Sequence, residues 1–581
     1  MLHLLLALCA LVGTAPAHAG NYVTQGPLVA QSRVADCKVG QPWNMPVIAW
    51  GADIATSYAN GNSKRTARGS IIDQHGLDIQ LVSRDDFRAQ LDDYLTCKSP
   101  FLRGTLGMIN MASELTNRDP RTQMVVFHQL SWSTGADALV VRGDINELTD
   151  LKGKTIVLQA YGPHVDLLVN VLQTAGLSAS DVTIKYVPDL LVTDKNSFSP
   201  ATAMGSDPSV AAAFVIMPEA QVLTAHGTVG TGREGSVKGA RILFSTARAD
   251  RVVPDVYAVR KDVFDANRDR IEALAHALLV ADEKTVAIMG PNNTDKKAYG
   301  DLVSAAAGLL LDNPTDSDDI VQLYQGMQLA GYGGNFRFFA DSNYASGFDG
   351  LTAEIQPAFM QLRLLTRRVS LTQAGWDWTR MVRDLTNTGD VVVPHFNPAA
   401  AARFLEGRVQ RDTEQGELFG FDIYFAPRQS NFPVEQYQDQ FDRILKLATE
   451  YSGALIDIQG YVDPTGYLAS LGLIDPTKPK LSPKALSDQR QALRNLSLGR
   501  ANAVRDALIA YAKSKNQTFD PGQFGTTGWG VTQPNVPGCT HDSSGELTIS
   551  CKPKTAAEWD ATRRVRFSFT VVGTESDVFV K

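Results

Sequence analysis

The sequence is short of the features that mark several large classes of protein. After residues 1–19 it has no apolar run near the ~20 residues that a membrane-spanning helix needs. Its net charge of -7 has the wrong sign for a nucleic-acid partner. The Walker A loop, the GxSxG elbow and the HExxH pair are missing, so no catalytic centre, metal site or cofactor is expected. Cysteine is scarce, with 5 among 581 residues.

What is present is the composition of an ordinary globular protein. With 581 residues, 44% of them hydrophobic and 20% charged, the chain is too long for one core, and two or three domains are expected. Residues 1–19 predict a secretory signal, because an apolar run at residues 4–12 is followed by the small-residue ending Ala17-His18-Ala19. The mature protein is therefore expected to be exported, with neither a membrane span nor a lipid anchor.

Removal of this signal leaves four cysteines, an even number for an oxidising compartment in which disulfides form. Of the three possible connectivities, pairing within each half of the chain is favoured. A bridge within the C-terminal pair would close a loop of roughly a dozen residues, which contributes on the order of 3 kcal/mol by chain entropy. A metal site is the alternative, but the sequence has no CxxC or nearby histidine pair. The four residues are Cys37, Cys97, Cys539 and Cys551.

The most informative stretch lies near the C-terminus. Residues 456–460 alternate apolar and polar side chains, which predicts a half-buried strand, and the turn residues that follow leave Asp463 at its exposed end. Between residues 496 and 508 apolar side chains recur at helical spacing, with Ser497 as the expected cap and Arg500 one turn further in. A carboxylate and a guanidinium are thus expected to face one pocket.

This stretch resembles the OmpA-like peptidoglycan-binding domain, in which a strand ending in Gly-His-Thr-Asp and a Gly precede Leu-Ser-x-x-Arg-Ala-x-x-Val on a helix. In that family the aspartate and the helix arginine hold the diaminopimelate of the wall peptide. The resemblance assigns these roles to Asp463 and Arg500, and makes Arg563 and Arg564 lesser contacts. The matching residues are Gly460, Asp463, Gly466, Leu496, Ser497, Arg500, Ala501 and Val504, continued by Gly528-Trp529-Gly530, Pro534 and Arg563-Arg564-Val565.

The chemistry agrees with this assignment, because diaminopimelate carries an ammonium and a carboxylate on one carbon, which suit an aspartate and a fork-shaped arginine. The alternative is a turn aspartate and a surface-helix arginine without a ligand. The sequence departs from the family by an insertion between Tyr467 and Arg494 and by Tyr461 at the histidine position. Leu493 and Thr562 also stand where the family has Asn. Some members carry a bridged excursion before the paired arginines, as expected here for Cys539 and Cys551.

Residues 45–260 alternate strand-like and helix-like segments, which predicts an α/β fold with parallel sheets covered by helices on both faces. Residues 150–190 resemble the second-lobe entry of periplasmic solute-binding proteins of the nitrate, sulfonate and thiamine-precursor group. They read Leu-Lys-Gly-Lys, a strand, a Gly turn, a helix, Ala-Gly-Leu and another strand. The resemblance covers about residues 46–290 and implies a ligand between two lobes. The expected strands are 45–50, 77–82, 124–127, 138–141, 154–158, 183–187 and 211–216.

The turn at Gly162 is the first expected ligand contact. It follows a strand and opens a helix, so free backbone N–H groups and the helix dipole favour an anion there. The alternative is that Gly162-Pro163 merely starts a helix. Further candidate contacts are Trp50, Thr134, Gly135, His164 and Glu219.

The predicted organisation is a signal peptide (1–19), a two-lobed solute-binding-protein-like module (40–386), a linker (387–415) and an α+β OmpA-like domain (416–575). The first hypothesis is a peptidoglycan-tethered protein of the Gram-negative periplasm, associated with the outer membrane. It captures a small polar or anionic solute for an ABC-type permease or for envelope sensing. The second is a structural envelope protein whose front module binds a protein partner. An exported enzyme is disfavoured for want of a catalytic constellation.

Overall fold

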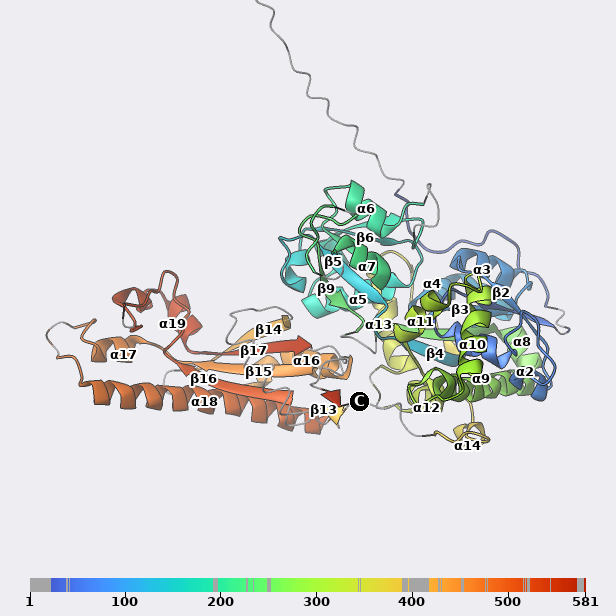
Figure 1. Cartoon of the computed structure of the whole chain (residues 1–581). Helices are drawn as coiled ribbons and strands as arrows, with labels where there is room; N and C mark the ends of the chain where they lie inside the picture. The colour runs from blue at the N-terminus through green and yellow to red at the C-terminus, as the bar shows by residue number, and fades with distance from the viewer. Residues whose placement is uncertain are drawn as a thin grey trace, which may run out of the picture.

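The computed structural model of the chain shows two bodies joined end to end, a two-lobed front module and an elongated C-terminal domain (Figure 1). It describes residues 22–388, 395–396, 417–571 and 579–580, apart from 38–39, 41, 192–196, 226–227, 234, 248–251, 343, 345, 427–428, 430, 451–453, 476, 478, 516, 518, 520–522 and 544. The predicted signal peptide and most of the predicted linker lie outside these residues. No described helix is long and apolar enough to cross a bilayer.

Lobe 1 is built on a mixed sheet in the order β11-β4-β10-β3, with β12 added alongside β4. A separate parallel pair, β1 and β2, lies beside it. Its strands are β1 (Trp43–Val47), β2 (Ile79–Ser83), β3 (Phe101–Thr105), β4 (Met124–Ser133), β10 (Pro254–Arg260), β11 (Met327–Leu329) and β12 (Thr372–Gln373). Its helices are α1 (Asp53–Ala59), α2 (Ile71–Gln74), α3 (Phe87–Leu95), α4 (Leu106–Thr116), α8 (Lys261–Ala266), α9 (Arg268–Met289), α10 (Lys296–Leu310), α11 (Ser317–Gln325), α12 (Gly331–Ala340), α13 (Phe348–Gln361) and α14 (Trp378–Met381).

Lobe 2 is a five-stranded sheet in the order β7-β6-β8-β5-β9. The chain enters it at the end of β4 and leaves it before β10, so two crossings join the lobes. Its strands are β5 (Asp137–Val141), β6 (Thr155–Gln159), β7 (Thr183–Val187), β8 (Ala212–Ile216) and β9 (Arg241–Ser245), and its helices are α5 (His164–Ala175), α6 (Pro200–Ser206) and α7 (Met217–Leu223).

The expectation of parallel sheets was wrong in part. Strands β6, β7 and β8 are parallel, but β5 is antiparallel to β8 and β9, and β10 is antiparallel to β3 and β4. The two exceptions are the first strands after each crossing between lobes, where the chain enters a sheet from the opposite direction. The sequence pattern also missed β3, because Arg103 and Gly104 interrupt its apolar run although every residue of the strand is buried.

The C-terminal domain is a four-stranded sheet in the order β14-β17-β15-β16, in which only β15 and β16 are parallel. One long helix, α18, runs along the sheet (Figure 1). The strands are β14 (Glu417–Tyr424), β15 (Ala454–Tyr461), β16 (Phe524–Gly530) and β17 (Arg564–Val571), and the helices are α16 (Gln438–Glu450), α17 (Thr465–Ser470), α18 (Pro483–Ser514) and α19 (Ala556–Thr562). A short pair, β13 (His395–Phe396) with β18 (Phe579–Val580), completes the described strands.

The prediction that Ser497 caps a helix was wrong. Helix α18 begins at Pro483, and its cap is Ser482, whose side chain accepts a hydrogen bond from Ala485 N. The inserted residues thus add turns to the front of the helix, which places Ser497 in its middle. There the buried Ser497 hydroxyl accepts a hydrogen bond from Gly530 N (3.0 Å) and joins the helix to β16.

Helix α18 approaches the sheet closely because two facing positions lack a side chain. A Cβ atom on Gly460 of β15 would lie 2.0 Å from the Ser497 carbonyl oxygen, and one on Gly528 of β16 would lie 2.5 Å from the Arg494 carbonyl oxygen. The helix and these two strands therefore contact backbone to backbone. Packing thus explains Gly460 and Gly528, whereas Gly466 has nothing within 4 Å of its Cβ position.

The insertion and the bridged excursion form a second small core in this domain. The insertion includes α17 and the start of α18, and the excursion runs from Val531 to Cys551. Arg490 forms an ion pair with Glu546 (2.6 Å), and the Tyr467 hydroxyl donates to the same carboxylate (2.8 Å). The buried apolar residues of this core are Val462, Tyr467, Leu468, Leu471, Leu486, Val531, Leu547 and Cys551.

Both disulfides pair within one half of the chain, Cys37 with Cys97 and Cys539 with Cys551, which agrees with the predicted connectivity. The two bodies meet where Lys446 of α16 reaches α13 and α5. Its Nζ lies 2.7 Å from Glu354 Oε2 and donates to Gln173 Oε1 (2.9 Å).

Replacing Gly460 with alanine should destabilise the C-terminal domain by about 1 to 3 kcal/mol, because the new methyl group overlaps a helix carbonyl that has no room to move. Denaturant unfolding of the variant measures the loss. Gly499, in the interior of the same helix, is the matched control. Nothing lies within 4 Å of its Cβ position, so Gly499→Ala should leave stability unchanged or raise it by up to about 1 kcal/mol. Equal effects of the two substitutions would contradict the close contact.

Candidate functional site

The junction between the lobes is a buried polar network around Asp137, the first residue of β5. Its carboxylate accepts hydrogen bonds from Ser133 Oγ (2.6 Å) and from His164 Nε2 (2.9 Å). Thr246, at the return crossing, contacts Ser133 Oγ (2.9 Å) and accepts from Asp137 N (3.1 Å). Both crossings and the start of α5 are therefore tied to one residue, Asp137, which is only 4% exposed.

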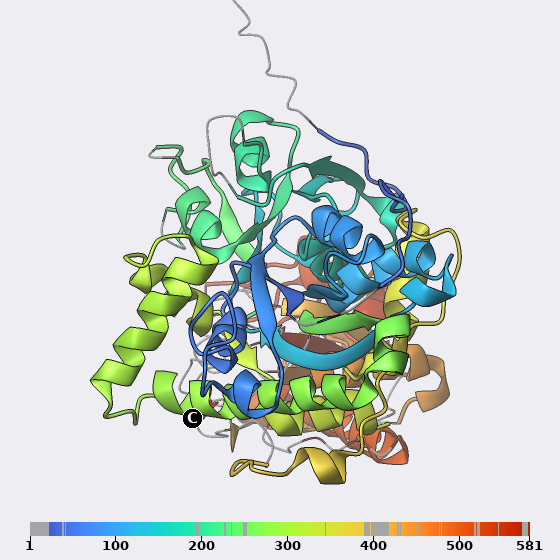
Figure 2. The same cartoon turned by 90° about the vertical axis from the view of Figure 1, so that its right-hand side faces the viewer.

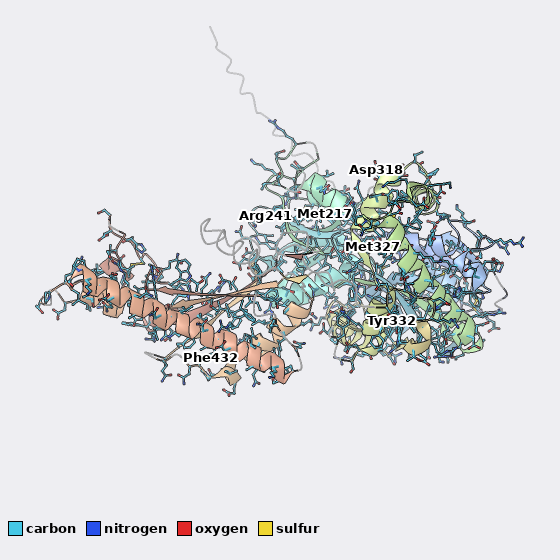
Figure 3. All side chains as sticks on the ribbon, turned by 60° about the horizontal axis from the view of Figure 1, so that its bottom comes forward. Met217, Arg241, Asp318, Met327, Tyr332 and Phe432 are labelled. Atoms are coloured by element: carbon cyan, nitrogen blue, oxygen red, sulfur yellow. A yellow bond between two sulfur atoms is a disulfide. The ribbon has the colours of Figure 1, made fainter. Side chains whose placement is uncertain are left out.

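The segment before α12 closes over this junction. Gly326 O accepts a hydrogen bond from Thr134 N (2.9 Å), and β11 pairs with the end of β4. Met327 of β11 pairs with Ser133 of β4, and in the view of Figure 3 it is seen between Met217 of lobe 2 and Tyr332 of lobe 1. A Cβ atom on Gly326 would lie 2.8 Å from the Cβ of Ala136, so the backbone there fills the space between the lobes.

Beside the junction, lobe 1 holds a guanidinium between two buried carboxylates. Arg103 Nε and Nη2 both donate to Asp53 Oδ2 (3.0 and 2.8 Å), and Nη1 donates to Asp255 Oδ1 (2.5 Å). Burial raises the pKa of Asp53 to about 6, although the Arg103 charge opposes this. Ser131 Oγ donates to Asp255 Oδ2 (3.1 Å) and accepts from Trp50 Nε1 (3.3 Å). The network thus reaches Trp50, which is one of the predicted ligand contacts.

The structure brings several predicted ligand contacts to the junction, but as members of closed networks. Gly135 N donates to Thr246 Oγ1 (3.1 Å), and His164 is 1% exposed against Asp137. Gly162 is buried, and a Cβ atom there would meet Gln159 Oε1 at 2.2 Å. Glu219, on α7, instead accepts from Ser199 Oγ at the start of α6 (3.3 Å).

The predicted anion site at the Gly162 turn is covered by the chain itself. Tyr161 N donates to Gln25 Oε1 (3.2 Å), and Gly26 N donates to the Tyr161 hydroxyl (3.2 Å), so an N-terminal segment lies on the turn. Deeper in the junction, Asp166 of α5 accepts from Gly107 N of α4 (3.2 Å). In the described state, protein groups occupy the positions expected for a solute.

A second candidate site lies at the end of β15 in the C-terminal domain. Arg500 is 2% exposed. It donates to the carbonyl oxygens of Gln429 (Nε, 2.8 Å), Tyr461 (Nη1, 3.1 Å) and Ala426 (Nη2, 3.4 Å), with its Cζ 5.1 Å from the Phe425 ring centroid. Burial lowers its pKa to about 10, and the charge of Arg563 adds to this effect. Three of the five N–H groups of a guanidinium are thus used on backbone oxygens.

Asp463 and the paired arginines lie at the same end of the sheet as Arg500. The Asp463 carboxylate favours the charged form of Arg500 and accepts Thr465 N (2.8 Å) at the start of α17. Arg563 donates to Asp560 Oδ1 (2.8 Å). Arg564 donates to Asp422 Oδ2 (3.0 Å), with its Cζ 4.9 Å from the Tyr461 ring centroid. The structure therefore gathers the four residues that the sequence singled out at one end of the sheet.

Sequence reasoning missed the residues that organise the lobe junction, namely Asp137, Asp166 and Arg103. Asp137 directly precedes a predicted strand, and Asp166 lies in the first turn of a predicted helix. Arg103 lies inside an otherwise apolar strand, where a charged residue requires a buried partner. This signal in the sequence could have predicted the network. The described residues contain no group of three or more His, Cys, Asp or Glu side chains that could hold a metal ion.

Replacing Asp137 with alanine should lower the stability of the front module by about 1 to 3 kcal/mol, because the buried His164 imidazole loses the acceptor of its Nε2. Thermal and denaturant unfolding measure the change. Asp144, in the loop after the same strand, is the control. Its side chain is 64% exposed and pairs with Lys154. Asp144→Ala should therefore stay within about 0.5 kcal/mol of the wild type. A similar small change for Asp137→Ala would show that the junction does not depend on this carboxylate.

No protein-family model matches the chain, and no curated protein matches it. Among solved structures, the alkanesulfonate-binding protein SsuA from Xanthomonas axonopodis pv. citri, bound to MOPS, is 15% identical with a TM-score of 0.37, over 57% of this chain and 97% of its own. The periplasmic aliphatic sulphonate binding protein SsuA from Escherichia coli is also 15% identical with a TM-score of 0.37, over 57% of this chain and 90% of its own. The desulfurization enzyme DSZB is 16% identical with a TM-score of 0.34, over 57% of this chain and 95% of its own. Such distant likenesses do not assign a function.

Proposed function

We propose that the protein is an exported component of the Gram-negative cell envelope, held non-covalently to peptidoglycan by its C-terminal domain. The observation that supports the proposal is the group of Asp463, Arg500 and Arg563 at the end of β15. A half-buried carboxylate beside two cationic side chains suits an amino acid that carries both charges on one carbon. Diaminopimelate in the wall peptide presents such a group.

Each charged group has a separate task in this proposal. The Asp463 carboxylate binds the ammonium group of the ligand. Arg500 already donates three N–H groups to carbonyl oxygens, and its two remaining N–H groups bind the ligand carboxylate. Arg563, 16% exposed, adds positive charge on the same side. Burial of Arg500 strengthens the interaction, since a charge pair away from water is weakly screened.

Replacing Asp463 with asparagine should abolish most binding to purified sacculi, because the ligand ammonium loses its counter-charge at a cost of about 1 to 3 kcal/mol. The variant keeps the side-chain oxygen that accepts Thr465 N, so the turn is preserved. Co-sedimentation at moderate salt, with circular dichroism to confirm folding, measures the loss. Arg500→Lys should also fail, because an ammonium cannot replace a guanidinium that serves several acceptors.

The chain supplies a matched control. Asp475 begins a second Asp-Pro-Thr turn and accepts Thr477 N (3.1 Å) in the same manner. Asp475→Asn should therefore pellet with sacculi like the wild type. If folded Asp463→Asn pellets equally well, the C-terminal domain does not hold the wall through this site.

Solute binding by the front module is the second candidate function, favoured by buried polar atoms at the lobe junction. Among the described residues, His164 Nδ1 and Asp166 Oδ1 are buried without a hydrogen-bond partner. Unpaired buried polar atoms are costly, and a bound molecule that pairs with them is stabilised. Under this candidate a small polar or anionic solute binds between the lobes after they separate, for an ABC-type permease or for sensing. If the front module binds no solute, its lobes stay closed and its surface binds a protein partner.

A panel of sulfonates, carboxylates, nitrate and pyrimidines separates these two roles by thermal shift. A true ligand should raise the melting temperature of the front module by several degrees at saturating concentration, since it binds only the folded state. Asp137→Ala should abolish that shift, because it disrupts the junction. Absence of a shift with the whole panel would count against solute capture and in favour of the protein-partner role.

A further inference from the structure

The contact between Asp166 and Gly107 joins the two lobes at one point. Asp166 lies in the first turn of α5 in lobe 2, and Gly107 is the second residue of α4 in lobe 1. Gly107 N donates to Asp166 Oδ2 (3.2 Å). The first N–H groups of a helix have no partner within the helix, so they can donate to an acceptor from another element. A side chain of one lobe therefore occupies the helix end of the other.

The sequence makes room for this contact. A Cβ atom at position 107 would lie 1.4 Å from Asp166 Oδ1, so any other residue would displace the carboxyl group. Gly107 has no left-handed backbone angle that would require glycine. A glycine inside a helix costs up to about 1 kcal/mol relative to alanine. Close approach of Asp166 explains its presence.

The N-terminal arm, residues 22–37, ties the same lobes together on the outside. At one end, Tyr22 Oη donates to Asp207 (2.6 Å) and Val23 N donates to Tyr186 O (2.9 Å), both in lobe 2. At the other end, Ala35 N donates to Leu95 O (3.0 Å), and the disulfide to Cys97 fixes the arm to lobe 1. Figure 2 shows this arm, in dark blue, running down the side of the module from one lobe to the other.

We propose that Asp166 is an interlobe latch, whose carboxyl group docks on the N-terminus of α4 and keeps the lobes closed beneath the N-terminal arm. Separation of the lobes breaks this contact. The carboxyl group is 5% exposed, and its Oδ1 has no hydrogen-bond partner among the described residues. The hydrogen bond from Gly107 N to a buried, incompletely paired carboxyl group makes a contact that can be released. The latch does not depend on wall binding. A solute can enter the junction only after the contact between Asp166 and Gly107 is broken.

The latch should weaken as pH rises. Burial raises the pKa of Asp166 to about 7, while Thr105 and Gly107 N oppose this and the carboxylates of Asp255 and Asp137 add to it. Glu354 of α13 and Asp166 line one small cavity. The guanidinium of Arg103 is already paired with Asp255. In open lobes the carboxyl group reaches water and its pKa returns toward about 3.9. The closed state therefore binds more protons, so closure is most favoured below about pH 3.9, weakens as pH rises from there, and changes no further above about pH 7.

Hydrogen exchange at the Gly107 amide tests the latch in the full-length protein, because its acceptor lies in the other lobe. Asp166→Ala should lower the protection factor of this amide on the order of tenfold. Asp166→Asn keeps an oxygen acceptor and should retain protection. Met108 N, which donates to Thr105 Oγ1 within lobe 1 (3.2 Å), is the internal control and should not change.

The pH dependence gives an independent readout. Between pH 6 and pH 8 the Gly107 protection factor, corrected for intrinsic exchange, should fall on the order of tenfold in the wild type and stay constant in Asp166→Asn. Equal protection of Gly107 in the wild type and in Asp166→Ala would overturn the latch. A wild-type protection factor independent of pH would overturn its release by ionisation. Neither result bears on sacculus binding, which is measured separately.

Discussion

The buried ion pairs of Arg103 fix the geometry on which the front module depends. The guanidinium joins the start of α1, through Asp53, to β10, through Asp255, and it projects from β3. Thr105, the cap of α4, lies two residues further along the same chain. Loss of one partner from such a buried group leaves an uncompensated charge, which costs about 3 to 5 kcal/mol. The position of the α4 N-terminus, and hence the contact between lobes, follows from this interaction.

Arg500 plays a comparable structural part in the C-terminal domain. Its bonds to Ala426 and Gln429 hold the segment after β14, and its bond to Tyr461 O holds the end of β15. The residue that the sequence pattern marks for ligand binding therefore also orders the backbone around the candidate site. Asp463 contributes less to the structure, because its side chain accepts one turn hydrogen bond, from Thr465 N. In the proposed wall-binding role, ligand contact and folding can be separated at Asp463 but not at Arg500.

Much of the architecture could be predicted from the sequence, because its signals are local. The alternation at residues 456–460 and the helical spacing after Leu496 gave β15 and the second half of α18, and the disulfide pairs followed from their grouping. The mixed sheets could not be predicted, since strand direction depends on where the chain crosses between lobes. The start of α18 was missed because the apolar spacing was followed only from Leu496, which made Ser497 the expected cap, although Ser482-Pro483 carries a clear start signal.

The candidate sites divide in the same way. The grouping of residues near Asp463 could be predicted because they match a pattern known from the OmpA-like domain, and their role stays a prediction. The role of Gly162 could not be judged, because nothing local reveals that Gln25, from a distant segment, covers its turn. Contacts between lobes join residues far apart in sequence, such as Gly107 and Asp166, and no periodicity reports them.

The shared core of the insertion and the bridged excursion links the fates of two segments that are separate in sequence. Tyr467, Leu468 and Leu486 cover Val531 and Leu547, and are covered by them. Deletion of either segment would expose the apolar face of the other to water, where such patches promote aggregation. A shortened C-terminal domain that keeps its stability would therefore have to lose both segments together.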